Sequence, residues 1–283
     1  MKILICMRKS ECRHNALRVG GTIALATHSD VTVLFVLPHP PERFDEYLEA
    51  DVDEKGRSIK DRVEESHQVD QRLLREAKEE LASIGIDAEV KLRQGAPVKE
   101  AIKESVEGRY DLIVVGSRSL QGIKAKFESF SERLIEHASI PVLVANSVSK
   151  LSDILLCVEG TEQSRITVEY AADFARAMNA KVTILSVAKN EKEVEKAWEA
   201  VHYAERILKE AKITADGKIR IGKPITEIEE ESVNYDLVLV GSHKFGILET
   251  LLLSNPSLDI VESSRAPILV VRKGEEAACK DSH

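Results

Sequence analysis

The chain contains one pattern of segments twice, and this duplication constrains its fold more than any other feature. Five segments recur in the same order: ILICM at 3–7 as ILLCV at 154–158, VTVLFV at 31–36 as VTILSV at 182–187, GAPVKEAI from Gly95 as GKPITEI from Gly222, YDLIVVGS from Tyr110 as YDLVLVGS from Tyr235, and IPVLVA from Ile140 as APILVV from Ala266. A repeat this long is a whole domain and not a solenoid unit. The sequence therefore predicts two copies of one domain.

The length and the offsets between matching segments predict where the two domains lie. A chain of 283 residues suggests about two domains. We expect a first domain at 1–147, a second at 152–273 and a polar tail at 274–283. The offset falls from 151 to 127 after the second segment, so the first repeat carries an insertion near 39–62. We expect a charged, solvated extension there; a lid or partner-binding surface is the alternative.

The apolar segments predict a parallel sheet in each repeat. They are continuous apolar runs bounded by Gly, Pro and Asp, which is typical of strands covered by helices on both faces. The expected strands are 2–7, 31–37, 87–93, 111–116 and 140–145, then 153–158, 181–187, 217–222, 236–241 and 267–272, and the first repeat has helical patterns at 12–28, 60–85, 97–107 and 129–138. Right-handed crossovers then give an α/β fold of two doubly wound five-stranded parallel sheets, each with strand order 3-2-1-4-5.

Composition excludes several classes of protein. The net charge is -8 and aromatic residues make up 4% of the chain, so neither nucleic acid nor an anionic membrane is an expected partner. No apolar run approaches the ~18 residues of a membrane helix, and the N-terminal apolar run is too short for a signal peptide. The four cysteines form no C-x-x-C pair, which argues against a disulfide framework or a zinc site and favours the cytoplasm.

A ligand of such a sheet is expected where strands 1 and 4 separate, beyond their carboxyl ends. After strand 4, each repeat has a small-residue turn that leads to Ser or Asn at a helix start, from Gly116 in the first and Gly241 in the second. Backbone N–H groups, hydroxyl donors and the positive end of a helix can bind an anion there. The alternative is that these residues are ordinary helix caps, since neither loop is a Walker A or G-x-G-x-x-G motif.

The same segments resemble a known family. VVGSR with SERLIEHASIPVLV, and LVGSH with IVESSRAPILVV, are similar to the universal stress protein (UspA) domain, and the duplication is similar to its tandem form. The resemblance implies a non-catalytic stress-response regulator. Members of this family fall into two groups, those that bind ATP and those that do not. It also implies that 140–145 pairs with 266–271 as an intrachain pseudo-dimer; a further homodimer is left open.

Members that bind ATP carry a Gly, two residues, a second Gly, nine residues, and then Gly-Ser or Gly-Thr. In the first repeat Gly116 matches, but Ser119 stands at the second Gly and Glu128 at the third, after eight residues. Glu128 would repel phosphate, and Arg8 replaces the acidic residue that lies near the nucleoside in binding members. The candidate cofactor-binding residues of this repeat are Gly116, Ser119, Ser129 and Ser131.

The second repeat is closer to the binding pattern. Glu159 keeps an acidic residue after strand 1, and the nine-residue spacing holds, although Lys244 replaces the second Gly. By resemblance, Val187 borders the adenine ring. The candidate cofactor-binding residues are Glu159, Gly160, Thr161, Val187, Gly241, His243, Lys244, Gly246, Ser254, Asn255 and Ser257. The expected ligand is ATP or AMP, with Mg²⁺ accompanying ATP, and the second repeat is favoured.

Two other functions stay open at this point. The broken glycine patterns allow a member that binds no nucleotide and acts only through protein–protein contacts. A slow ATP hydrolase is the third hypothesis, but the sequence offers no positioned general base, catalytic residue or metal ligand for it. Cys6 and Cys157 occupy matching places in the two repeats, and we expect buried small hydrophobes there and not a redox pair.

Overall fold

A computed structural model describes residues 1–7, 13–37, 59–116, 130–146, 150–160, 162–241 and 266–272. The strands of the first repeat are β1 (Lys2–Met7), β2 (Asp30–Leu37), β3 (Glu89–Gln94), β4 (Leu112–Gly116) and β5 (Val142–Ala145). Those of the second are β6 (Asp153–Cys157), β7 (Lys181–Ala188), β8 (Ala215–Ile221), β9 (Leu237–Gly241) and β10 (Ile268–Val271). Every strand overlaps the apolar run that predicted it.

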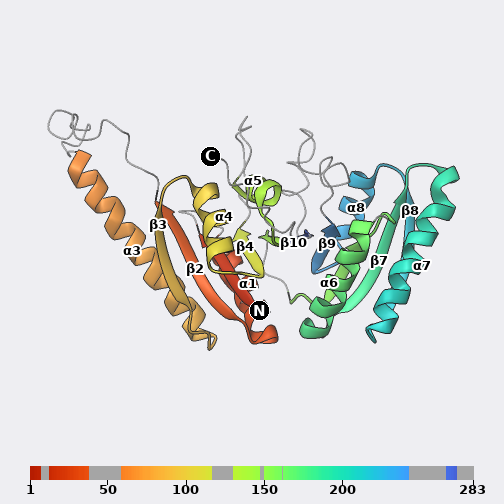
Figure 1. Cartoon of the computed structure of the whole chain (residues 1–283), viewed down its shortest axis with the longest axis horizontal. Helices are drawn as coiled ribbons and strands as arrows, with labels where there is room; N and C mark the ends of the chain where they lie inside the picture. The colour runs from red at the N-terminus through yellow and green to blue at the C-terminus, as the bar shows by residue number, and fades with distance from the viewer. Residues whose placement is uncertain are drawn as a thin grey trace, which may run out of the picture.

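Within the described residues these strands form a single ten-stranded sheet in the order β3-β2-β1-β4-β5-β10-β9-β6-β7-β8 (Figure 1). Each half has the predicted order 3-2-1-4-5, and its strands are parallel. The expected pair of five-stranded sheets differs from the structure in one detail, because the two sheets are continuous. The halves join because β5 and β10, the last strand of each repeat, pair antiparallel with Leu269 opposite Leu143. The expected pairing of these two strands, and the pseudo-dimer it makes, are confirmed.

The joining of the halves has a simple physical cause. The last strand of a lone repeat would be an edge that exposes unpaired backbone groups and an aliphatic surface. Both β5 and β10 are short and aliphatic, and three residue pairs connect them. Each strand thereby supplies the neighbour that the other lacks, and among the described strands β3 and β8 remain as the edges.

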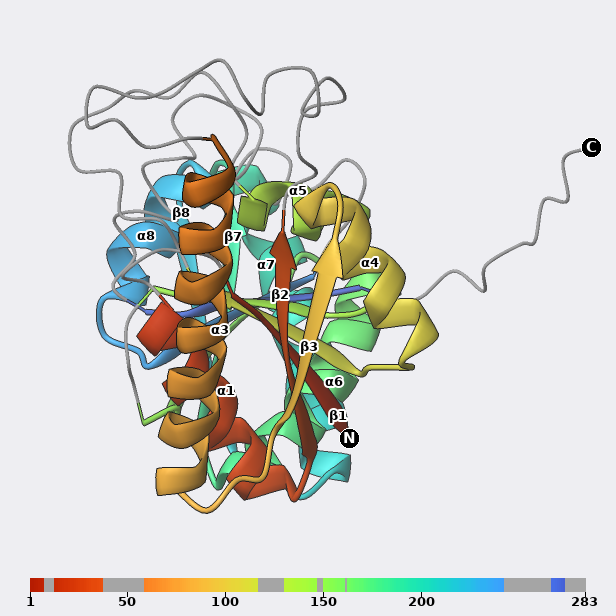
Figure 2. The ribbon, with the colours of Figure 1, turned by 90° about the vertical axis from the view of Figure 1, so that its left-hand side faces the viewer.

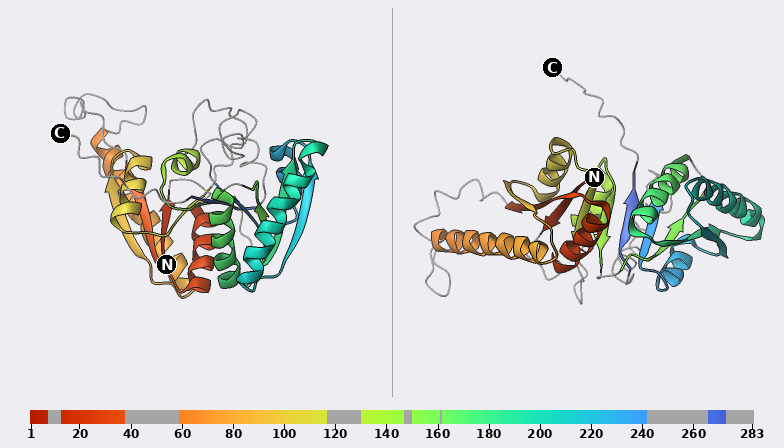
Figure 3. Two further views of the ribbon diagram at one scale, coloured as in Figure 1. Left: turned by 45° about the vertical axis from the view of Figure 1, so that its right-hand side comes forward. Right: turned by 90° about the horizontal axis from the view of Figure 1, so that it is seen from below.

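Helices cover both faces of the sheet, as the continuous apolar strands predicted. One face carries α1 (Arg13–Thr27), α3 (Ile59–Ser83), α6 (Glu162–Met178) and α7 (Val194–Glu210), and the other carries α4 (Pro97–Glu107), α5 (Phe130–His137) and α8 (Pro224–Ser232). Alternate residues of β1 point to opposite faces, Ile3 and Ile5 toward α1 and Leu4 and Cys6 toward α4 and α5. Figures 2 and 3 show these two layers from the end and from below.

The two repeats also contact each other beyond the paired strands. Helices α1 and α6 lie side by side at the centre of the molecule, whereas α3 and α7 lie at its ends (Figure 1). Asn146, after β5, donates through Nδ2 to the carbonyl of Ala266 at 3.2 Å. Arg272, after β10, donates through Nη1 to the carbonyls of Glu136 at 2.6 Å and Ala138 at 3.2 Å. Each repeat therefore uses the residue after its last strand to hold the other.

Candidate functional site

The switch point of a sheet is the place where the order of its strands reverses. In each repeat it lies beside the first strand, which pairs with the second strand on one side and the fourth on the other. In the second repeat β6 pairs with β7 on one side and with β9 on the other. Because the strands are parallel, the residues after β6 and at the ends of β7 and β9 meet at one edge of the sheet. The described candidates at this edge are Glu159, Gly160, Val187 and Gly241. Four of the eleven residues predicted in this repeat are thus brought together by the fold.

The loop after β6 holds Glu159 and Gly160 in a defined position. The amide of Val158 donates to the carbonyl of Leu185 at 2.9 Å, which continues the pairing with β7. The Glu159 amide then donates to the Oγ of Ser164 at 3.2 Å, and Gly160 turns the chain with φ of +74°. Glu159 is half-buried at this turn. An acidic side chain therefore stands at the carboxyl end of β6, beside β7.

The remaining described candidates differ in their exposure to solvent. Val187, near the end of β7, is half-buried, and so are the terminal glycines of β4 and β9, Gly116 and Gly241. Ser131 lies in the first turn of α5 and is only 5% exposed. Its burial makes it a poorer candidate for a phosphate donor than its place in the sequence suggested.

Most of the predicted phosphate-binding residues lie outside the described residues. They are Thr161, His243, Lys244, Gly246, Ser254, Asn255 and Ser257 in the second repeat and Ser119 and Ser129 in the first. Arg8 and Glu128, the departures from the binding pattern, also lie there, as do most of the insertion near 39–62 and the tail at 274–283. The described part of the candidate site in the second repeat is consequently the edge that carries Glu159, Gly160, Val187 and Gly241.

Sequence reasoning missed two residues of this site. Ser164 fixes the Glu159 amide, and Ala200 on α7 faces Gly160, so that a Cβ placed on Gly160 would lie 3.3 Å from the Ala200 Cβ. Ser164 is the third residue of α6, the position from which the side chain of a capping box reaches back to a backbone N–H before the helix, so its place was a signal that could have found it. Ala200 offered no such signal because alanine has no functional group.

Each repeat also contains an equivalent buried carboxylate, and these two groups stabilise the fold. Glu104 on α4 is 2% exposed and accepts from Lys91 Nζ at 2.9 Å, Arg93 Nε at 2.7 Å and the Tyr110 hydroxyl at 3.1 Å. Burial alone raises the pKa of Glu104, but hydrogen bonds from Lys91 and Arg93 outweigh it and lower the pKa overall. A carboxylate held in this way is a fixed acceptor and a poor general base.

The second repeat contains the equivalent carboxylate. Glu231 on α8 is also 2% exposed, is hydrogen-bonded to Lys218, and accepts from Arg220 Nη2 at 2.7 Å. Burial again raises its pKa, and the two cations again lower it overall. Both carboxylates attach a helix to an edge strand, α4 to β3 and α8 to β8. Among the described residues no group of His, Cys, Asp or Glu is arranged to hold a metal ion.

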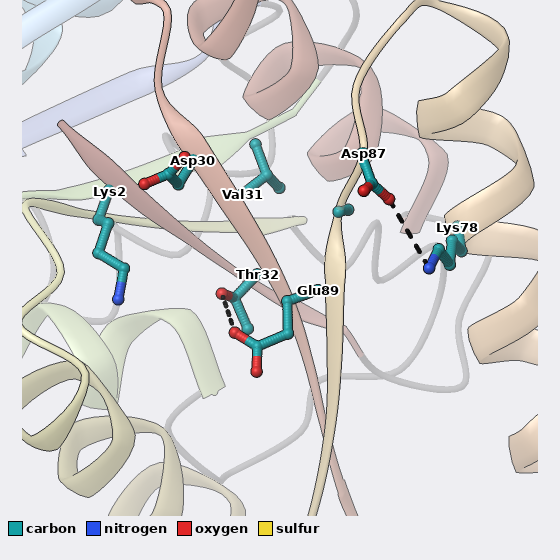
Figure 4. Close-up of a pocket in the computed structure, with 8 residues that line it drawn as sticks. Lys2, Asp30, Val31, Thr32, Lys78, Asp87 and Glu89 are labelled. Atoms are coloured by element: carbon teal, nitrogen blue, oxygen red, sulfur yellow. Dashed lines mark hydrogen bonds and ion pairs between the residues drawn. The ribbon is translucent and has the colours of Figure 1, made fainter.

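A pocket of about 360 Å³ lies at the opposite end of the first repeat's strands (Figure 4). It is lined by Lys2, Asp30, Val31, Thr32, Lys78, Asp87, Ala88 and Glu89. Its polar groups contact one another: Thr32 Oγ1 donates to Glu89 at 3.3 Å, and Lys78 lies 3.7 Å from Asp87. Lys78 comes from α3 and the other lining residues from the amino ends of β1, β2 and β3, so the pocket is separate from the switch point.

This chain is similar in sequence to a known family of proteins. The model of the universal stress protein family matches residues 1–146 and again 151–272. Universal stress protein YxiE of Bacillus subtilis is 28% identical over 138 residues, which cover 48% of this chain and 81% of that protein. A universal stress protein of Mycolicibacterium smegmatis is 23% identical over 207 residues, 66% of this chain and 70% of that protein.

A solved structure shows the same fold over the whole length. The crystal structure of a universal stress protein from Archaeoglobus fulgidus has a TM-score of 0.74 and 21% identity, covering 97% of both chains. In the part of this chain that the structure describes, no helix has both the length and the apolar character needed to cross a membrane. Since the family model accounts for both repeats, the chain belongs to the universal stress protein family and carries its domain in tandem.

Proposed function

We propose that this chain is a non-catalytic stress-response regulator that binds an adenine nucleotide, ATP or AMP, at the switch point of its second repeat. The observation that carries the proposal is the turn after β6, where half-buried Glu159 and exposed Gly160 stand between the ends of β7 and β9. This is the place where open α/β sheets bind ligands.

The nucleoside end of the ligand fits the described residues. An ionised carboxylate only accepts hydrogen bonds, so Glu159 suits the hydroxyl groups of a ribose. Val187 offers half-buried apolar surface near the end of the adjacent strand, which suits a purine ring. An acceptor beside an apolar wall is the combination that a nucleoside needs.

The phosphate end rests on the sequence after Gly241. There Lys244 supplies a positive charge, and Ser254, Asn255 and Ser257 supply hydroxyl and amide donors. If ATP is the ligand, Mg²⁺ enters on its phosphates, since this ion usually keeps several waters and needs few protein ligands. In the first repeat Arg8 and Glu128 replace the residues that a nucleotide would need. We therefore propose one nucleotide per chain.

Calorimetric titration with ATP and with AMP, each with and without Mg²⁺, tests this proposal. We expect saturable binding at one site per chain, weakened roughly tenfold to a hundredfold by Glu159→Ala, because a hydrogen bond to a charged group contributes about 1.5–3 kcal/mol. Glu195→Ala, an exposed position on α7, is the control and leaves binding unchanged. If neither nucleotide gives a heat of binding, the proposal that this chain binds a nucleotide is wrong. A regulator that acts through protein–protein contacts is then the remaining hypothesis.

A further inference from the structure

The loop after β6 lies unusually close to helix α7. A Cβ added to Gly160 would lie 3.3 Å from the Cβ of Ala200 and 4.0 Å from its Cα. The φ of Gly160 is +74°, a region that L residues other than glycine rarely adopt. The position of the loop therefore depends on a small residue on each side of the contact.

Ser164, on α6, is hydrogen-bonded to the same loop. Its Oγ accepts from the Glu159 amide at 3.2 Å, and the Ser164 side chain is buried, so packing restricts its rotation. Ala200 is also buried, in a row on α7 with Val201, Ala204 and Leu208. Besides the hydrogen bond from Val158 to β7, the loop that carries Glu159 is thus held by a hydrogen bond to α6 and a close contact with α7.

The first repeat has none of these three residues. At the offset of the first strands, Lys9 corresponds to Gly160 and Arg13 corresponds to Ser164. The buried faces of α3 and α7 also correspond, Ala77 with Ala204 and Leu81 with Leu208, so Leu73 corresponds to Ala200. The two repeats therefore differ at every position that fixes the loop in the second.

We propose that Gly160, Ser164 and Ala200 are positioning residues of the nucleotide site in the second repeat. They hold the loop so that the Glu159 carboxylate faces the nucleoside, and their replacement in the first repeat removes this geometry there. This inference rests on the proposed function, because it explains how that site is oriented and why only one repeat has it. None of the three needs to contact the ligand.

The test compares adenosine with AMP, because a displaced Glu159 loop affects the nucleoside and leaves phosphate contacts unchanged. In Ala200→Leu the larger side chain must displace Gly160, and we expect the Kd for both ligands to rise at least tenfold and by the same factor. Ala200→Ser keeps the residue small and should bind as the wild type does. Leu73→Ala, the matched change in the first repeat, should leave both Kd values unchanged.

A second pair of variants covers the case in which Ala200→Leu does not fold. Ser164→Ala removes the acceptor of the Glu159 amide, and we expect the Kd for adenosine and AMP to rise severalfold together. Ser164→Thr keeps the hydroxyl and should restore binding, which a purely structural role would not predict. Circular dichroism and the thermal midpoint confirm that each variant is folded.

The outcomes separate this inference from the proposed function. If the wild type binds neither ATP nor AMP, the proposed function fails. If the wild type binds and the folded Ala200→Leu and Ser164→Ala proteins keep its Kd values, the positioning role is wrong and the proposed function stands. A rise for AMP without one for adenosine also overturns the positioning role, because the loop would then act on the phosphate.

Discussion

The two repeats share the chemistry that builds the fold and differ in the chemistry that would bind a ligand. Both attach a helix to their edge strand through a buried carboxylate, Glu104 or Glu231, that pairs with a lysine and an arginine two residues apart on the strand. By contrast, Gly160 and Ser164 have no equivalents in the first repeat. The comparison teaches that the two copies of a duplicated sheet can be kept while the loops at their switch points diverge in sequence.

The two equivalent carboxylates also differ, because the cations around Glu104 are less exposed than those around Glu231. Lys91 and Arg93 are 32% and 21% exposed, whereas Lys218 and Arg220 are both 42% exposed. Arg93 also pairs with Glu100 and Glu107. Cations with more access to water lose less when their partner is removed, so the two networks should differ in strength.

The largest expected effect is on stability, and it compares the two networks directly. Glu104→Gln should lower the free energy of unfolding by about 3 kcal/mol, because it removes the buried carboxylate that both Lys91 and Arg93 contact, and these cations are less exposed than those around Glu231. Glu231→Gln should cost about 2 kcal/mol, since its cations are better hydrated. Urea denaturation followed by circular dichroism measures both. Equal losses, or a larger loss for Glu231→Gln, would remove the proposed difference between the repeats.

The same carboxylates should make stability fall in acid. The pKa of each is lower in the folded chain than its ordinary value of 4.5. Their stabilisation is therefore complete above that ordinary value and is lost as the pH falls through the folded pKa. The unfolding free energy of the wild type should drop more steeply below about pH 4.5 than that of Glu104→Gln. Parallel curves for the two proteins would contradict this assignment.

A smaller effect is expected at the junction between the repeats. Arg272 donates to two carbonyls at the carboxyl end of α5, where a helix also attracts positive charge. Arg272→Ala should lower the free energy of unfolding by about 1–2 kcal/mol, and Arg272→Lys should recover part of it. Asn146→Ala, the equivalent position after β5, loses an uncharged donor and should cost about 1 kcal/mol. Urea denaturation again decides, and a larger loss for Asn146→Ala would reverse the comparison.

The sequence predicted the sheet well because its strands are covered on both faces. Three strands begin two residues away from the expected position: β3 at Glu89 and not at 87, β5 at Val142 and not at 140, and β8 at Ala215 and not at 217. Ala215, Asp216 and Gly217 have low strand propensity and join β8 only because β7 pairs with them. The antiparallel pairing of β5 with β10 was likewise implied by the family resemblance and not by the apolar pattern.

The candidate site was only partly predictable, and the reason is physical. Glu159 and Gly160 could be found because they follow the first strand of the repeat, where topology places ligands. Ala200 could not be found, since its importance lies in a contact with Gly160 that exists only in the folded chain. A small residue that permits close approach leaves no chemical pattern in a sequence.

The smallest effect compares Cys6 with Cys157, which should behave alike. Both are buried, and burial raises the pKa of Cys157 to about 12 and that of Cys6 further still, with Glu231 and Glu104 adding to the shifts. The thiolate is the reactive form, so neither should react with iodoacetamide at about pH 8 in the native protein. A variant with Cys12 and Cys279 replaced by Ser should show no labelling until it is unfolded, when both thiols react. Rapid native labelling of Cys157 alone would mean that the second repeat opens at β6, and the loop that carries Glu159 would then be less fixed than its contacts with Ser164 and Ala200 imply.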